Sequence, residues 1–198
     1  NPQNPYGMSK IAEEMFALEL GKRYKIPTVA MRYSIVQGSR QSFYNAYSGA
    51  CRIFSLAFHQ GKEPQIYEDG NQVRDFVNIH DVVDANLLVL EDERADYEMF
   101  NVGGGAPVTV NQFASACAKI YGIKNYQPKP SGKYRFGDTR HIWSDISKLE
   151  SLGWKPSRTI YDSIVEYKEW LDTASSLDNI IEYCSKKMEQ LNVLRDVS

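Results

Sequence analysis

The stretch NPYGMSKIAEEMFALELGKRYKIPTVAMRY, residues 4–33, decides the class of fold, because its pattern changes from helical to extended. Asn4 is a suitable N-cap, and Pro5 suits the first position of a helix. Apolar side chains then recur at helical spacing to about residue 24. After a proline, residues 28–33 form a short run rich in β-forming residues, which is typical of a buried strand. The stretch therefore predicts a helix followed by a strand.

The rest of the chain continues this alternation, which predicts an α/β protein. Apolar periodicity, turn residues and capping signals set the approximate bounds of each element. Helices are expected at residues 50–61, 81–91, 109–122, 145–152, 160–171 and in a C-terminal amphipathic segment with Leu177, Ile180, Ile181, Cys184, Met188 and Leu191 as its stripe; strands are expected at 65–67, 73–79 and 99–102.

Composition excludes several classes of protein. The net charge of −2 over 198 residues argues against a partner that is a nucleic acid or an anionic membrane. No apolar run approaches the roughly 18 to 20 residues that a membrane-spanning helix needs. The three cysteines lie far apart, so they predict neither a disulfide framework nor a metal site, and they suit a reducing, cytoplasmic location.

Tyr6 and Lys10 are four residues apart, so a helix places both side chains on one face. An ammonium group beside a phenol favours the phenolate and lowers its pKa from about 10, which would make a proton acceptor usable near neutral pH. The spacing alone is also common in pairs that only decorate a helix surface, so the pair by itself leaves both interpretations open.

Several segments resemble signatures of the extended short-chain dehydrogenase/reductase family. Residues 4–10 are similar to its N-P-Y-x-x-S-K segment, and the resemblance continues in the family's order over most of the chain. Within the family, the chain looks most like enzymes that act on nucleoside-diphosphate sugars. The further matching segments are residues 30–38, 67–83, 100–103, 135–138 and 144–156.

The resemblance implies catalytic and cofactor-binding roles. Tyr6 would be the acid/base that moves a sugar hydroxyl proton, and Lys10 would tune Tyr6 and bind the ribose of NAD, with NADP as an alternative cofactor. Tyr33 and Ser34 would lie beside the nicotinamide ring. No glycine-rich phosphate loop occurs in the chain, because the glycines at 103–105 have the wrong spacing and predict a turn.

The resemblance also implies a pocket for the sugar nucleotide. Arg74 would bind the substrate pyrophosphate with support from Arg135, and Asp138 would contact the nucleotide ribose. A guanidinium group matches phosphate oxygens in a bidentate manner, which agrees with these roles. The alternative for Arg74 is a surface pair with Asp75 at the end of a strand.

One departure from the family pattern concerns the substrate contact. The family often has an asparagine where this chain has Ile35, so that contact is expected to come from Asn45 or Ser34.

The resemblance implies the C-terminal part of a Rossmann-type doubly wound sheet together with a smaller mixed α/β substrate-binding domain. The family's glycine-rich motif and its catalytic Ser or Thr would precede Asn1, so we expect a fragment of a longer, homodimeric protein. The expected parts are 1–40 and 67–105 for the dinucleotide-binding domain, 41–66 and 106–171 for the substrate-binding domain, and 172–198 for a C-terminal amphipathic helix.

The expected activity is NAD-dependent epimerisation of a nucleoside-diphosphate sugar through a transient keto intermediate. Two other enzymatic activities stay open, a sugar-nucleotide 4,6-dehydratase and an NADP-dependent reductase. A non-catalytic sugar-nucleotide-binding module is the alternative from another class, although such a module has no need of a tuned phenolate.

Overall fold

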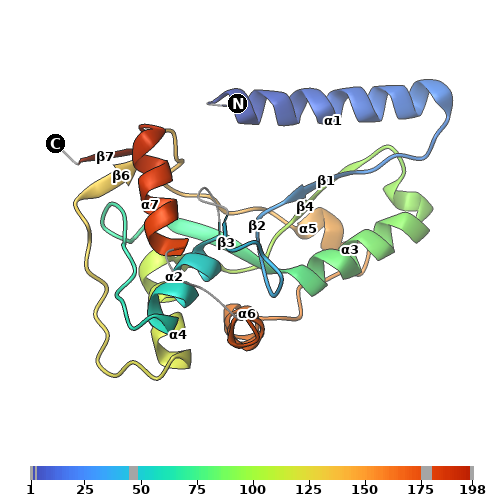
Figure 1. Ribbon diagram of the computed structural model, residues 1–198. Coiled ribbons are helices and arrows are strands. Elements are labelled where there is room, and N and C mark those ends of the chain that lie inside the picture. The colour runs from blue at the N-terminus through green and yellow to red at the C-terminus, as the bar shows by residue number, and fades with distance from the viewer. Residues whose placement is uncertain (1, 3, 45–48, 175–179, 197–198) are drawn as a thin grey trace.

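The computed structural model describes residues 2, 4–44, 49–174 and 180–196, and it has the predicted α/β architecture (Figure 1). The helices are α1 (Pro5–Tyr24), α2 (Ala50–His59), α3 (Ile79–Glu91), α4 (Val110–Ile120), α5 (Ser147–Glu150), α6 (Ile160–Asp172) and α7 (Ile180–Gln190), with a 3-10 turn at Glu93–Ala95. The strands are β1 (Ala30–Tyr33), β2 (Ile35–Gln37), β3 (Val73–Asn78), β4 (Met99–Val102), β5 (Pro107–Thr109), β6 (Lys133–Arg135) and β7 (Leu194–Asp196).

Two parallel strand pairs meet where β1 ends and β2 begins. β1 pairs with β4 and β2 pairs with β3, both in parallel, while β5 joins β3 in the antiparallel direction. The chain crosses from the first pair to the second at Ser34, between β1 and β2. β1 and β4 end together at this crossing, and in open α/β sheets ligands bind outside the carboxyl ends of parallel strands.

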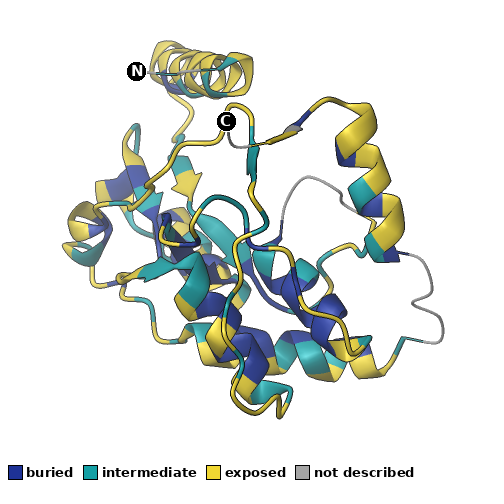
Figure 2. Cartoon of the chain, turned by 90° about the vertical axis from the view of Figure 1, so that its left-hand side faces the viewer, coloured by how far each residue is buried: buried dark blue, intermediate teal, exposed yellow. Residues whose placement is uncertain are grey.

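Two apolar clusters hold the chain together. The larger one packs α2, α4, α6 and α7 around Phe113 and Tyr167, both fully buried. The smaller one places α3 and α5 against β4, with Val102 and Leu149 at its centre. Figure 2 shows that buried residues gather in these packed elements. The stripe predicted for the C-terminal helix is confirmed for Ile180, Cys184 and Met188, which are buried, and Ile181 is half-buried. Leu191 follows the end of α7 and is exposed, so its place in the stripe is wrong. Leu177 lies outside the described residues.

Helix α1 lies apart from both clusters and is mostly exposed (Figures 1 and 2). The carboxylate of Glu14 on this helix accepts two hydrogen bonds, of 2.5 and 2.6 Å, from the guanidinium of Arg32 on β1. Large apolar side chains on the helix remain open to solvent, with Met15 and Phe16 exposed by 62% and 68%. The helix therefore carries apolar surface that these described residues do not cover.

Some expected elements differ in the structure. The prediction of a strand at 65–67 is wrong, because only an isolated bridge between Ile66 and Pro130 forms there. The strand expected at 28–33 is shorter, and β2, β5, β6 and β7 were not expected. Helix α3 begins two residues earlier than expected and is capped by Asn78, whose side chain accepts a hydrogen bond from the His80 backbone. Asp81 is instead buried and binds Arg158 at 2.8 Å.

No helix among the described residues combines the length and the apolar character needed to cross a bilayer.

Candidate functional site

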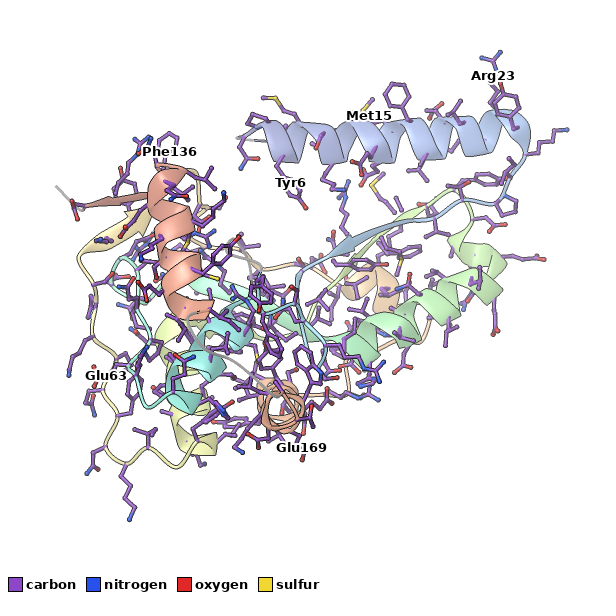
Figure 3. The ribbon with its side chains drawn as sticks, in the orientation of Figure 1. Tyr6, Met15, Arg23, Glu63, Phe136 and Glu169 are labelled. Carbon is purple, nitrogen blue, oxygen red and sulfur yellow. The ribbon has the colours of Figure 1, made fainter. Side chains whose placement is uncertain are left out.

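A cavity of about 580 Å³ lies among α2, α7, β3 and the segment after β6. Arg74, Arg135 and Asp138 line it together with Tyr6 from the distant helix α1. Figure 3 shows Tyr6 pointing from α1 towards the body of the chain. Four of the residues expected to form the site, from three separate parts of the sequence, therefore meet at one cavity.

Two guanidinium groups converge on one carboxylate within the cavity. The Oδ2 atom of Asp138 lies 3.8 Å from Nη2 of Arg74 and 3.7 Å from Nη1 of Arg135. Arg74 also donates to the backbone carbonyls of Val73 and Arg140, at 2.9 and 2.7 Å, which fixes its direction. Burial lowers the pKa of the Arg74 guanidinium from its usual value. The described lining of the whole cavity holds four cationic and three anionic side chains, so one positive charge is in excess, which favours a bound phosphate.

The alternative interpretation of Arg74 and Asp75 as a surface pair is wrong. Asp75 is fully buried, and the Arg74 side chain is 12% exposed. In β3 the two side chains point to opposite faces, so each makes its own set of contacts.

Asp75 is a buried residue whose contacts the sequence analysis missed. Its Oδ2 atom accepts hydrogen bonds from the Ser34 hydroxyl at 2.7 Å and the Ser144 backbone at 3.2 Å. Its Oδ1 atom accepts one from the Gly104 backbone at 2.7 Å. The signal in the sequence was an acidic residue on the apolar face of an alternating strand, followed later by a glycine cluster.

The glycine cluster has a packing role beyond the turn predicted for it. A Cβ atom on Gly103 would collide with the Asp75 carboxylate, and one on Gly104 would collide with the Phe76 carbonyl. Glycine is therefore required at both positions, because the end of β4 passes directly over β3.

Tyr6 and Lys10 share one face of α1 as predicted, with Nζ of Lys10 5.9 Å from the centre of the Tyr6 ring. Lys10 also binds Glu13 at 2.7 Å, and this contact raises the pKa of the Lys10 ammonium. Tyr6 is 70% exposed. The effect of Lys10 on the Tyr6 phenol stays a prediction.

The two residues expected beside a nicotinamide ring, Tyr33 and Ser34, are not among those that line the cavity. The Tyr33 hydroxyl donates to Oδ1 of Asn86 at 2.8 Å. Ser34 shares a hydrogen bond of 2.8 Å with Ser144 in addition to its bond to Asp75. Ile35 does line the cavity, whereas Asn45 lies outside the described residues.

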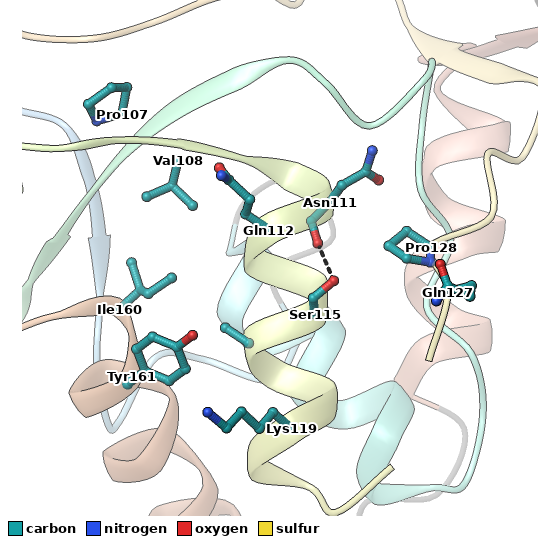
Figure 4. A pocket seen from close by; sticks show the side chains of 11 residues that line it. Pro107, Val108, Asn111, Gln112, Ser115, Lys119, Gln127, Pro128, Ile160 and Tyr161 are labelled. Atoms are coloured by element: carbon teal, nitrogen blue, oxygen red, sulfur yellow. Dashed lines mark hydrogen bonds between the residues drawn. The ribbon is translucent and has the colours of Figure 1, made fainter. Parts of the chain in front are cut away.

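A second hollow, of about 790 Å³, lies on the outer side of α4 (Figure 4). Lys119 is the one charged residue among those that line it, and the Ser115 hydroxyl there donates to the Asn111 carbonyl at 2.8 Å. The hollow brings together none of the residues expected to perform chemistry.

The described residues contain no group of three His, Cys, Asp or Glu side chains placed to hold a metal ion. All three cysteines are buried and free. Burial raises the pKa of the Cys51 thiol to about 12, so it stays protonated at neutral pH.

Comparison with known proteins gives a consistent result. Residues 1–103 match the model of the NAD dependent epimerase/dehydratase family. The chain is 35% identical to a dTDP-L-rhamnose 4-epimerase of Burkholderia thailandensis, over 89% of this chain and 48% of that protein. It spans about half the length of the curated relatives it matches.

Solved structures show the same similarity. A Thermotoga maritima UDP-glucose 4-epimerase with UDP-glucose superposes with a TM-score of 0.78 at 35% identity, over 87% of this chain and 54% of that one. A Thermus thermophilus UDP-glucose 4-epimerase in complex with NAD gives a TM-score of 0.76 at 28% identity, over 88% of this chain and 56% of that one.

Proposed function

The chain belongs to the NAD-dependent epimerase/dehydratase family. We propose that its full-length gene product epimerises a nucleoside-diphosphate sugar with NAD as cofactor. The chain would supply the catalytic pair Tyr6 and Lys10 and most of the sugar-nucleotide pocket. The observation that carries the proposal is the meeting of Tyr6 with Arg74 and Arg135 at one cavity.

The charge and size of the cavity support a sugar nucleotide as the ligand. Arg74 and Arg135 present guanidinium groups that match a diphosphate, and Asp138 between them would accept from a ribose hydroxyl. A volume of about 580 Å³ lies within the range of roughly 300–1,000 Å³ for small-molecule sites. The relatives named for UDP-glucose and dTDP-L-rhamnose suggest these two as the first substrates to test.

The proposed chemistry begins at a sugar hydroxyl. Tyr6 takes the hydroxyl proton while the hydrogen on the same carbon departs as a hydride, which leaves a ketone. When bound, NAD would supply the acceptor for that hydride and the source of its return. The keto sugar rotates in the pocket, so the hydride returns to the opposite face of the carbonyl carbon, and Tyr6 gives the proton back to the oxygen. The configuration at that carbon is therefore inverted, and no net oxidation occurs. Lys10 stabilises the phenolate form of Tyr6 during this exchange.

The donors near the carboxyl end of β1 suit a dinucleotide. Lys10 is an ammonium donor for ribose hydroxyls, and Tyr33 and Ser34 lie at the end of β1, where parallel sheets bind such cofactors. Since Ser34 is already held by Asp75 and Ser144, its role in this proposal is to fix the strand end beside the nicotinamide.

The test is an assay of the full-length gene product with NAD and a panel that includes UDP-glucose, UDP-N-acetylglucosamine and dTDP-L-rhamnose. We expect a C4 epimer, detected by chromatography and proton NMR. A 4-keto-6-deoxy sugar would assign the dehydratase activity instead, and net consumption of NADPH would assign the reductase. Binding without any turnover would favour the non-catalytic module.

We propose a homodimer as the assembly of the full-length gene product. The exposed apolar side chains of α1, such as Met15, Phe16 and Leu20, support this, because burial between two copies would remove them from water. Sedimentation that shows only monomers would contradict it.

A further inference from the structure

The strand that carries Arg135 is paired with the last described strand of the chain. In the antiparallel pair of β6 and β7, Arg135 lies opposite Leu194. The backbone N–H of Phe136 donates to the carbonyl of Val193 at 2.9 Å. The guanidinium carbon of Arg195 lies 3.7 Å from the centre of the Phe136 ring, which adds a cation–π contact. The position of Arg135 thus depends on residues about sixty positions later in the sequence.

Helix α7 and strand β7 are joined by a backbone hydrogen bond. The backbone N–H of Val193 donates to the carbonyl of Met188 at 3.1 Å, which joins the end of the helix to the strand. Cys184 and Met188 are buried against the large apolar cluster, and the Cys184 sulfur accepts a hydrogen bond from Nη1 of Arg52 at 3.5 Å. The same helix lines the cavity through Ile181, Cys184, Ser185 and Met188.

The segment that carries Arg135 has a glycine on each side, and Asp138 follows the second of them. Gly132 and Gly137 adopt positive φ angles of 70° and 84°, in which a glycine is least restricted. Isolated strands are marginally stable, so a short segment between two such glycines needs a partner to keep one conformation. Among the described strands, β7 is the partner that pairs with β6.

We propose that residues 180–196 form a C-terminal clasp, in which β7 positions Arg135 and Asp138 and α7 closes one wall of the cavity. The clasp rests on the proposed function, because it acts on the diphosphate end of the same ligand. Arg135 contacts the ligand directly, and the residues of the clasp are positioning residues. Loss of β7 would weaken nucleotide binding without changing the cofactor site at β1 and β4.

The experiment uses two variants of the full-length gene product and two matched controls. One variant ends at Asn192 and so lacks β7; its control ends at Asp196. The second variant is Arg195→Pro, with Arg195→Ala as its control. Phe136 and Val193 lie opposite each other and are joined by a backbone hydrogen bond. Along an antiparallel strand pair, hydrogen-bonded positions alternate with positions that are not hydrogen-bonded, so residues 134 and 195 form the next hydrogen-bonded pair. Proline at position 195 removes the backbone N–H as well as the contact with the Phe136 ring, whereas alanine removes only the contact with that ring.

The probes are UDP, dTDP and NAD, measured by titration calorimetry. We expect at least about a tenfold weaker Kd for the nucleoside diphosphate in the truncated and Arg195→Pro proteins, and less than about a threefold change in both controls. The Kd for NAD should stay within about threefold in all four, which a general loss of structure would not allow. Circular dichroism checks that each variant is folded.

Unchanged nucleotide binding in folded Arg195→Pro protein would overturn the clasp alone. An equal loss of NAD and nucleotide binding would also overturn it, because the strand would then be a general structural element. If the unaltered protein bound neither UDP nor dTDP, the proposed function would fail, and the clasp with it.

Discussion

The hydroxyl of Ser34 lies 2.7 Å from Oδ2 of Asp75, and this contact joins the crossing between β1 and β2 to the strand that carries Arg74. The same carboxylate accepts from the backbone of Ser144 and of Gly104. One fully buried acidic side chain therefore ties together four segments that surround the candidate site.

The first prediction concerns this carboxylate. Asp75→Asn keeps the size of the side chain but replaces an oxygen acceptor with an NH2 group, which would face backbone or hydroxyl donors. We expect a loss of about 1.5–3 kcal/mol in the free energy of unfolding, the range for hydrogen bonds to a charged group. Urea denaturation measures it. Asp84→Asn is the control, since Asp84 is exposed and pairs only at the surface with Arg158. Equal stability of both variants would refute the role given to Asp75.

The second prediction concerns Tyr6. Tyr6→Phe keeps the ring and removes the exchangeable proton, so sugar-nucleotide binding should survive while kcat of the full-length gene product falls by about 10² or more. Steady-state kinetics and calorimetry together separate the two effects. A Phe variant with nearly normal kcat would show that Tyr6 is not the acid/base.

The third prediction concerns Arg74, which is proposed to bind the diphosphate. Arg74→Ala should weaken binding of the sugar nucleotide by about 1.5–3 kcal/mol, because a charge-assisted hydrogen bond is lost, and leave NAD binding nearly unchanged. Arg94→Ala is the matched control, since Arg94 lies on the surface and pairs with Asp92 at 2.6 Å. Equal losses for both ligands in titration calorimetry would instead mean that Arg74 has a structural role.

The fourth prediction concerns acid stability near the site. A hydrogen bond from the Arg140 side chain, with a second from the Asn71 backbone, lowers the pKa of Asp69 to about 2. The Arg140 carbonyl in turn accepts from Arg74. Because the folded pKa lies below the unfolded value of about 3.9, this contact stabilises the folded state above about pH 4. The stabilisation should be lost as the pH falls from about 4 to about 2.

Asp69→Asn should remove that part of the pH dependence. Urea midpoints measured from pH 5 to pH 2 should fall less steeply for the variant than for the unaltered protein. Identical slopes would mean that the pair contributes nothing measurable, as many exposed ion pairs do.

The fifth prediction concerns the 198-residue polypeptide by itself. It lacks a glycine-rich phosphate turn, and among its described strands β1 pairs with β4 alone. An unpaired strand edge and the exposed apolar residues of α1 favour association. We expect no measurable epimerase, dehydratase or reductase activity and weak NAD binding. Turnover by this polypeptide with NAD and the same panel of sugar nucleotides would show that the active site has been assigned wrongly.

Local signals in the sequence were enough for most helices and for the class of fold. The N-cap Asn4, the capping box of Thr109 and Gln112, and the apolar stripe of α7 each depend on residues a few positions apart. Such short-range contacts form within one element, so their spacing can be read without knowledge of the rest of the chain. The pair of Tyr6 and Lys10 was found in the same way.

Contacts between distant segments were decided only by the tertiary structure. Three such contacts join residues far apart in sequence. Asp75 accepts a hydrogen bond from Gly104, Arg135 pairs with Leu194 across two strands, and Tyr6 lines the same cavity as Arg74. Short strands such as β6 and β7 carry too few residues for a pattern, and their pairing depends on a partner elsewhere in the chain. Motifs in the sequence identify the candidate side chains, whereas the packing of helices and the crossing of strands bring them together. Chain topology, not local spacing, sets those distances.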